Sequence, residues 1–82
     1  MMKFNIDITI GLKEGMLDPE ARAIRHALSN LGFPTDNLST ARVFQITLDA
    51  PDSDAARGRA EEMCARLLAN PVIHRYTVEV RS

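Results

Sequence analysis

Residues 64–79 read CARLLANPVIHRYTVE, and the pattern of this stretch changes at Asn70-Pro71. Upstream of the change, apolar residues recur at helical spacing on one face: Ala56, Ala60, Met63, Cys64, Leu67 and Leu68. A residue before proline is disfavoured in the α region, so we expect this helix to end at Asn70-Pro71. Downstream, alternating side chains predict a strand, with one face formed by His74, Tyr76, Val78 and Val80.

The N-terminal part of the chain predicts a strand followed by a helix. Residues 3–12 alternate, and the apolar side consists of Phe4, Ile6, Ile8, Ile10 and Leu12. A helix is expected at about 19–31, because Asp18 suits the N-cap and Pro19 the first helical position. Gly32 and Pro34 then end this helix.

The middle of the chain, residues 38–50, predicts a second strand. Its apolar parity contains Phe44, Ile46, Leu48 and Ala50, but Arg42 falls on the same parity. An arginine on this face indicates a bulge near Ala41-Arg42 or a strand that extends beyond its own core. Two short strands with a kink between them fit equally well. A second helix is expected to open at Pro51–Asp54, with Asp52 or Ser53 as its cap.

Together these elements give the order β-α-β-α-β in a single domain, residues 1–82. We expect an α+β fold related to the ferredoxin-like pattern. In this two-layer sandwich, two helices lie on one face of an antiparallel or mixed sheet, and the middle strand is either one long strand or a bent or split one.

Composition limits the classes of function. The formal net charge is −1 and the basic residues are scattered, which argues against nucleic-acid binding. No apolar run suggests a signal peptide or a membrane span, so a cytoplasmic protein is expected. One cysteine excludes an intrachain disulfide, and the spacing of Cys64, His26 and His74 is not that of a zinc site. Self-association is the remaining way to stabilise so short a chain.

The sequence contains no evident set of catalytic groups. Cys64 falls on the apolar face of a helix, His26 beside an apolar face, and His74 has no nucleophile or carboxylate placed to use it. Gly15 and Asp18 resemble a phosphate loop only loosely, because no Gly-Lys-Ser/Thr motif follows. Arg42 fits either an interface contact or an exposed charge at a sheet edge.

Several segments resemble one family over essentially the whole chain. LKEGMLDPE at 12–20, AIRHALSNLG at 23–32, CARLLANPVI at 64–73 and YTVE at 76–79 are similar to PurS, the small subunit of phosphoribosylformylglycinamidine synthase. Two departures are visible. Ala41 stands where the family has glycine, and His74 stands where an acidic residue is common.

The resemblance implies a non-catalytic bridging subunit of an ATP- and glutamine-dependent ligase in purine biosynthesis. Its partners would be a second copy of itself, as homodimer or tetramer, a glutaminase subunit and a large synthetase subunit. The chain would assist ammonia transfer between them during conversion of formylglycinamide ribonucleotide (FGAR) to the amidine (FGAM). No cofactor or metal is expected in this chain, whereas ATP and magnesium are expected in the synthetase subunit.

Seven residues are the candidates for shaping the oligomer and its docking surfaces: Gly15, Asp18, Pro19, Arg42, Asn70, Pro71 and Tyr76. The main alternative is a dimeric small-molecule-sensing module of the ACT type, which also uses β-α-β units. A ferredoxin-like RNA binder is less well supported, because Phe4, Phe44 and Tyr76 fall on the apolar faces of their strands. We therefore expect these aromatic side chains in the core and not on an exposed sheet surface where they could stack on bases. A stand-alone enzyme is the weakest alternative.

Overall fold

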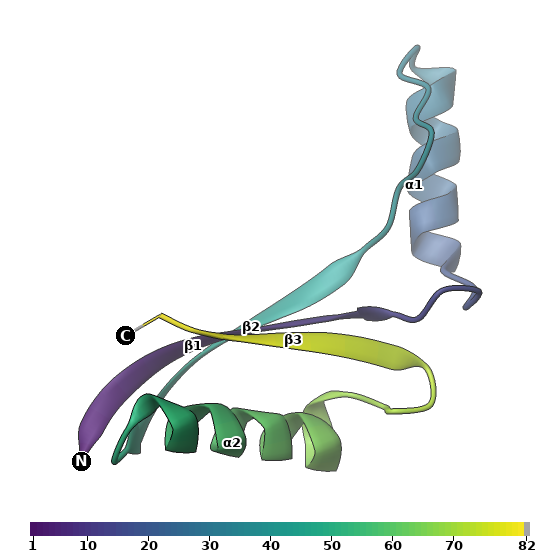
Figure 1. The fold of residues 1–82 in the computed structure, drawn as a ribbon. Helices are drawn as coiled ribbons and strands as arrows, with labels where there is room; N and C mark the ends of the chain where they lie inside the picture. The colour runs from purple at the N-terminus through teal and green to yellow at the C-terminus, as the bar shows by residue number, and fades with distance from the viewer. Residues whose placement is uncertain (82) are drawn as a thin grey trace.

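A computed structural model describes residues 1–81 of the chain (Figure 1). The elements are β1 (Met2–Leu12), α1 (Pro19–Asn30), β2 (Ala41–Ala50), α2 (Ser53–Met63) and β3 (His74–Val80), with a π-helical turn at Cys64–Leu68 that extends α2. The expected β-α-β-α-β order and α+β class are therefore confirmed.

The three strands form one antiparallel sheet in the order β2-β1-β3. Ile8 in the central strand lies opposite Phe44 of β2 and Val78 of β3. Because side chains alternate along each strand, the apolar residues of all three strands lie on the same face of the sheet. The opposite face carries polar side chains such as Asn5, Thr9 and Thr77.

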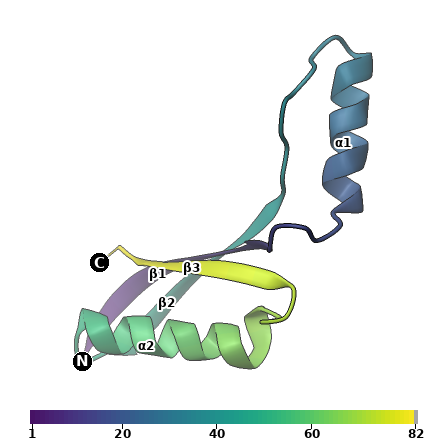
Figure 2. The same cartoon turned by 45° about the vertical axis from the view of Figure 1, so that its right-hand side comes forward.

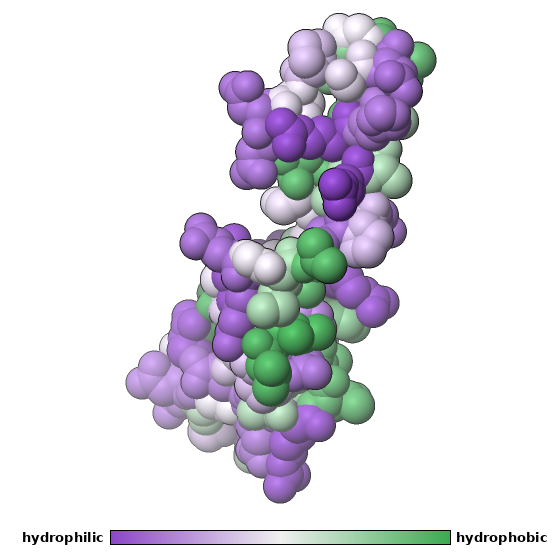
Figure 3. Space-filling model, turned by 90° about the vertical axis from the view of Figure 1, so that its right-hand side faces the viewer, coloured by the Kyte–Doolittle hydropathy of each residue, from purple (hydrophilic) through white to green (hydrophobic). Residues whose placement is uncertain are grey.

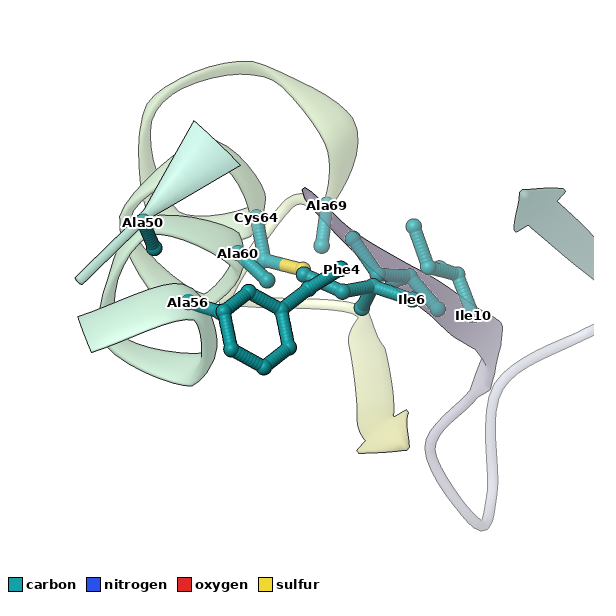
Figure 4. Close-up of a cluster of buried hydrophobic side chains, with 9 residues drawn as sticks. Phe4, Ile6, Ile10, Ala50, Ala56, Ala60, Cys64 and Ala69 are labelled. Atoms are coloured by element: carbon teal, nitrogen blue, oxygen red, sulfur yellow. The ribbon is translucent and has the colours of Figure 1, made fainter. Parts of the chain in front are cut away.

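Helix α2 and its π-helical turn cover the apolar face of the sheet (Figure 2). Small side chains at Ala56 and Ala60 are fully buried, so the helix can lie close to β1. Ile6, Ile8 and Cys64 are the largest fully buried side chains, and each isoleucine contributes about 1.5–3 kcal/mol on burial. The remaining core members shown in Figure 4 are Phe4, Ile10, Ala50 and Ala69.

Both ends of α2 follow from the sequence. Asp52 is the N-cap, and its carboxylate accepts a 2.7 Å hydrogen bond from the Ala55 amide. At the other end, the Ala69 amide donates to the Cys64 carbonyl at 3.0 Å, which closes the π-helical turn. Ala69 is then extended, so the helix ends just before the predicted stop at Asn70-Pro71.

Strand β2 is shorter and more regular than expected. It begins at Ala41 rather than residue 38, and its register with β1 continues unbroken from Ala50 to Ala41. The bulge and the split strand are therefore wrong. The other interpretation, a strand that extends beyond its core, is the one observed: Ala41, Arg42 and Val43 are exposed.

Helix α1 lies away from the sheet, so the expectation of two helices on one face is wrong for the single chain (Figures 1 and 2). The physical reason is that the sheet has only one apolar face, and α2 already covers it. The molecule is consequently elongated, 52 × 25 × 15 Å. Its radius of gyration is 16.2 Å, whereas a compact chain of this length would have about 12 Å.

Helix α1 nevertheless begins and ends as predicted. Pro19 is the first helical residue, and Gly32, with a φ of +93°, follows the C-cap residue Leu31. The amide of Phe33 donates to the carbonyl of Leu28 at 2.8 Å, the bond that characterises a Schellman motif. Local sequence signals therefore define this helix without support from the sheet.

Candidate interaction surface

The two turns singled out from the sequence contact each other through Lys13. Its backbone amide donates to the Ile73 carbonyl at 2.9 Å, and its Nζ donates to the Pro71 carbonyl at 2.6 Å. Gly15 lies two residues further along the same loop with a φ of +83°, a conformation that favours glycine. The loop after β1 and the turn before β3 thus form one continuous surface at this end of the sheet.

Asp18 joins the start of α1 to the start of β2. One carboxylate oxygen accepts from the Ala21 amide at 3.0 Å, and the other accepts from the Thr40 hydroxyl at 2.8 Å. The Ala21 and Thr40 hydrogen bonds favour the charged form, so the pKa of Asp18 is lowered. Asp18 and Pro19 therefore orient the helix relative to the sheet.

Asn70 closes the turn before β3. Its side-chain oxygen accepts from the Val72 backbone amide at 2.9 Å, and its backbone amide donates to Nδ1 of His74 at 2.9 Å. The Asn70 carbonyl also accepts from the His74 amide at 2.7 Å. His74 thus has a structural contact here, and Asn70 and Pro71 shape the turn rather than a catalytic centre.

Arg42 and Tyr76 lie in one row across the sheet, because both are paired with Ile10 of the central strand. Both side chains are on the face that α2 covers, at the end of the sheet from which α1 extends. The guanidinium of Arg42 lies 5.4 Å from the centre of the Phe44 ring, and Tyr76 is 39% exposed. The sheet therefore places these two candidates on the same surface.

A cleft of about 590 Å³ opens on the polar face at the same end of the sheet. Its polar lining from strands and loops includes Thr9, Lys13, Glu14, Asp18, Asn37, Ser39, Thr40, Arg75 and Thr77. Gly15 and Tyr76 also line it, whereas Arg42 does not. The seven candidates are thus gathered near one end of the sheet but divided between its two faces.

The groups considered for chemistry are dispersed in the described part of the chain. Cys64 is fully buried, and burial, with the nearby charge of Glu61, raises the pKa of its thiol. Within residues 1–81, no three side chains of His, Cys, Asp or Glu are grouped so that they could hold a metal ion. In the same range, neither helix is long and apolar enough to cross a membrane.

Sequence reasoning missed the exposed apolar surface of the α1 region. Leu31 is 72% exposed and Phe33 is 64% exposed, and Leu17 and Ile24 are exposed as well. Figure 3 shows apolar surface on both the α1 lobe and the sheet lobe, with a narrow waist between them. The available signal was that only one face of the predicted sheet is apolar, which leaves no place for a second helix.

A second missed surface is a groove of about 460 Å³ between α2 and β2. Its lining is mainly apolar, with Ile46, Met63, Leu67 and Leu68, and it also includes Arg59, Glu62 and Arg66. Leu67 was expected to be buried with the rest of the helical stripe but is largely exposed. The π-helical turn explains this difference, because it rotates the last residues away from the regular helical face.

Comparison with known proteins identifies the family. The model described as "PurS: Phosphoribosylformylglycinamidine (FGAM) synthase" matches residues 5–82. Phosphoribosylformylglycinamidine synthase subunit PurS of Methanothermobacter thermautotrophicus is 44% identical over 79 residues, covering 96% of this chain and 94% of that protein. The corresponding protein of Archaeoglobus fulgidus is 45% identical over 73 residues, covering 88% and 91%.

The fold agrees with this match. The crystal structure of Methanocaldococcus jannaschii PurS superposes with a TM-score of 0.87 at 38% identity and covers 96% of both chains. The fold thus agrees along nearly the whole length of the chain. The chain belongs to the PurS family of phosphoribosylformylglycinamidine (FGAM) synthase subunits.

Proposed function

We propose that the chain acts as the non-catalytic small subunit of the FGAM synthase complex in the cytoplasm. The observation that carries the proposal is the family match over residues 5–82. The M. jannaschii relative is described as one of the subunits of formylglycinamide ribonucleotide amidotransferase in the purine biosynthetic pathway. In this role the chain bridges a glutaminase subunit and a large synthetase subunit, and the latter binds ATP and magnesium.

The bridging role has a clear physical purpose. Ammonia released into neutral water is mostly protonated, and ammonium is not a nucleophile. Holding the two active sites together shields ammonia from solvent and raises its effective concentration at the second site. A subunit with this task needs docking surfaces rather than catalytic side chains.

Self-association, as homodimer or tetramer, is part of the same proposal. Its support is the apolar side chains that one chain leaves exposed, above all Leu31 and Phe33 beside α1. Exposed apolar patches of this kind on a small protein mark surfaces that another protein chain covers. Seven residues shape the framework of these surfaces: Gly15, Asp18, Pro19, Arg42, Asn70, Pro71 and Tyr76.

Reconstitution tests the proposal. The purified chain is mixed with the two partner subunits, FGAR, ATP and magnesium, and amidine formation is measured with glutamine or with ammonium salt as nitrogen donor. We expect glutamine-dependent amidation to require all three proteins, and ammonium-dependent amidation to depend less on the glutaminase. Equal glutamine-dependent rates with and without the chain would refute the proposed role.

A further inference from the structure

The cleft on the polar face of the sheet has a hollow floor, because the central strand places a glycine there. Gly11 lies two residues after Thr9 and so belongs to the same face, and it pairs with Ala41 of β2 and Arg75 of β3 without a bulge in either ladder. A Cβ atom on Gly11 would meet no atom closer than the Thr40 carbonyl oxygen at 3.9 Å. Packing within the chain therefore does not require glycine here, and a glycine inside a strand often marks a place where another molecule approaches closely.

Both connections between the sheet and α1 contribute walls to this cleft (Figure 1). Residues 13–16 and 18 come from the connection that follows β1, and residues 37–40 come from the connection that precedes β2. The volume of about 590 Å³ is within the range of about 300–1,000 Å³ that is typical of small-molecule sites. A molecule held in the cleft would contact the sheet and both connections at once.

Four charged side chains line the cleft, two of each sign: Lys13, Arg75, Glu14 and Asp18. Within residues 1–81, none of the four takes part in an ion pair. Binding sites match the charges of the molecules that they bind. Opposite charges that surround one cleft without pairing with each other therefore favour a ligand that itself carries both signs.

Two of these four groups are already engaged by the chain. Lys13 bonds the Pro71 carbonyl, and each carboxylate oxygen of Asp18 accepts a hydrogen bond from the chain. Glu14 and Arg75 are exposed, and in the described part of the chain their side chains take part in no ion pair. A guanidinium can hold a carboxylate through two parallel hydrogen bonds, and a carboxylate accepts hydrogen bonds from an ammonium group.

We infer that the cleft binds a free α-amino acid with a neutral polar side chain. Arg75 receives the α-carboxylate, and Glu14 receives the α-ammonium group. The remaining polar lining is uncharged and includes Thr9, Asn37, Ser39 and Thr77. Hydroxyl and amide groups both donate and accept hydrogen bonds, so they suit a carboxamide or hydroxyl side chain on the ligand but provide no partner for a third charge.

A chemical-shift titration of the isotope-labelled full chain with L-glutamine tests this inference. A ligand of about ten non-hydrogen atoms held by exposed charges should bind with a Kd on the order of 0.1–1 mM. N-acetyl-L-glutamine lacks the ammonium charge and L-glutamine amide lacks the carboxylate charge, so each should bind at least about tenfold more weakly. Ribose 5-phosphate and inorganic phosphate carry no ammonium group and should not bind.

Three variants test the location of the site. Arg75→Gln and Glu14→Gln each remove one charged partner and should each weaken L-glutamine binding at least about tenfold. Gly11→Val fills the hollow floor and should prevent binding, while urea denaturation shows a fold at least as stable, because valine favours strands. The controls Glu79→Gln and Arg22→Gln remove exposed charges outside the cleft and should bind L-glutamine like the wild type.

The outcomes are decisive for the cleft and separate from the proposed function. No shift changes up to about 10 mM L-glutamine, equal binding of either blocked analogue, or binding of phosphate in its place overturns the inference. Binding that survives Arg75→Gln overturns it as well, even if Gly11→Val fails to fold. The inference does not rest on the subunit role, which the reconstituted amidation measures independently.

Discussion

Because α1 lies away from the sheet, apolar side chains of the α1 region should contribute less to the stability of a single chain than buried core side chains do. Ile8 of β1 is fully buried beneath α2, whereas Leu31, just beyond the end of α1, is 72% exposed. Ile8→Val should lower the free energy of unfolding by about 1 kcal/mol and Tm by about 4–8 °C. Leu31→Ala should cost the single chain only about 0.5 kcal/mol, because little of this side chain is buried there.

For self-association we expect the opposite, namely that Leu31 matters more than Ile8. If a second copy covers Leu31, truncation removes about 1–2 kcal/mol of burial from each copy, or about 2–4 kcal/mol from a two-fold dimer. The dissociation constant of Leu31→Ala should then rise about 30- to 1,000-fold, while that of Ile8→Val should hardly change. Val72→Ala provides a matched control, since Val72 is equally exposed but lies in the turn before β3.

Urea denaturation at a low and a high protein concentration measures the stabilities, and analytical ultracentrifugation measures the association. The wild type should gain stability with concentration, and Leu31→Ala should lose most of that gain. A Leu31→Ala chain that is destabilised as strongly as Ile8→Val at low concentration would refute the reasoning. That result would mean that α1 packs on its own sheet.

Three further predictions follow from individual residues. The lowered pKa of Asp18 means that its contribution to stability is present above the usual aspartate pKa and is lost as pH falls through the lowered value; Asp18→Asn should flatten the acid limb of urea-denaturation midpoints plotted against pH. The raised pKa of the buried Cys64 thiol predicts very slow reaction with iodoacetamide in the native protein and fast reaction in urea, which mass spectrometry can follow. Gly32→Ala should lower the free energy of unfolding by about 1–2 kcal/mol, because φ is +93° there, whereas Gly58→Ala, inside α2 and free of close neighbours, should be neutral or stabilising in the same measurement.

The elements of the fold were largely predictable because their signals are local. Alternation in residues 3–12 and 74–80 identified two strands and their buried faces, and Asp18, Gly32 and Asn70-Pro71 marked helix ends. That β2 runs without a bulge or break was not predictable from the alternation of apolar and polar residues. Arg42 does lie on the apolar face, as its position requires, but that face is open to solvent at this point, so no bulge is needed.

The position of α1 illustrates a different limit. An apolar stripe predicts that a helix face will be covered, but it does not say whether the same chain or another one covers it. The link between Lys13 and Pro71 was equally hidden, since it joins two turns that are 58 residues apart and depends on the finished sheet. The structure places the candidate residues in two turns, at the start of α1 and on the outer strands, while their contacts required the three-dimensional structure.

The alanines beneath α2 have a consequence for solubility. Ala56 and Ala60 allow the helix to lie so close to the strands that Arg57 and Arg59 reach carbonyls at the two opposite borders of the sheet. A bulkier residue at either alanine would lift the helix and withdraw both arginines together. A modest packing defect in the interior would then free two borders at once for uncontrolled strand addition, so the chain would precipitate before it lost its secondary structure.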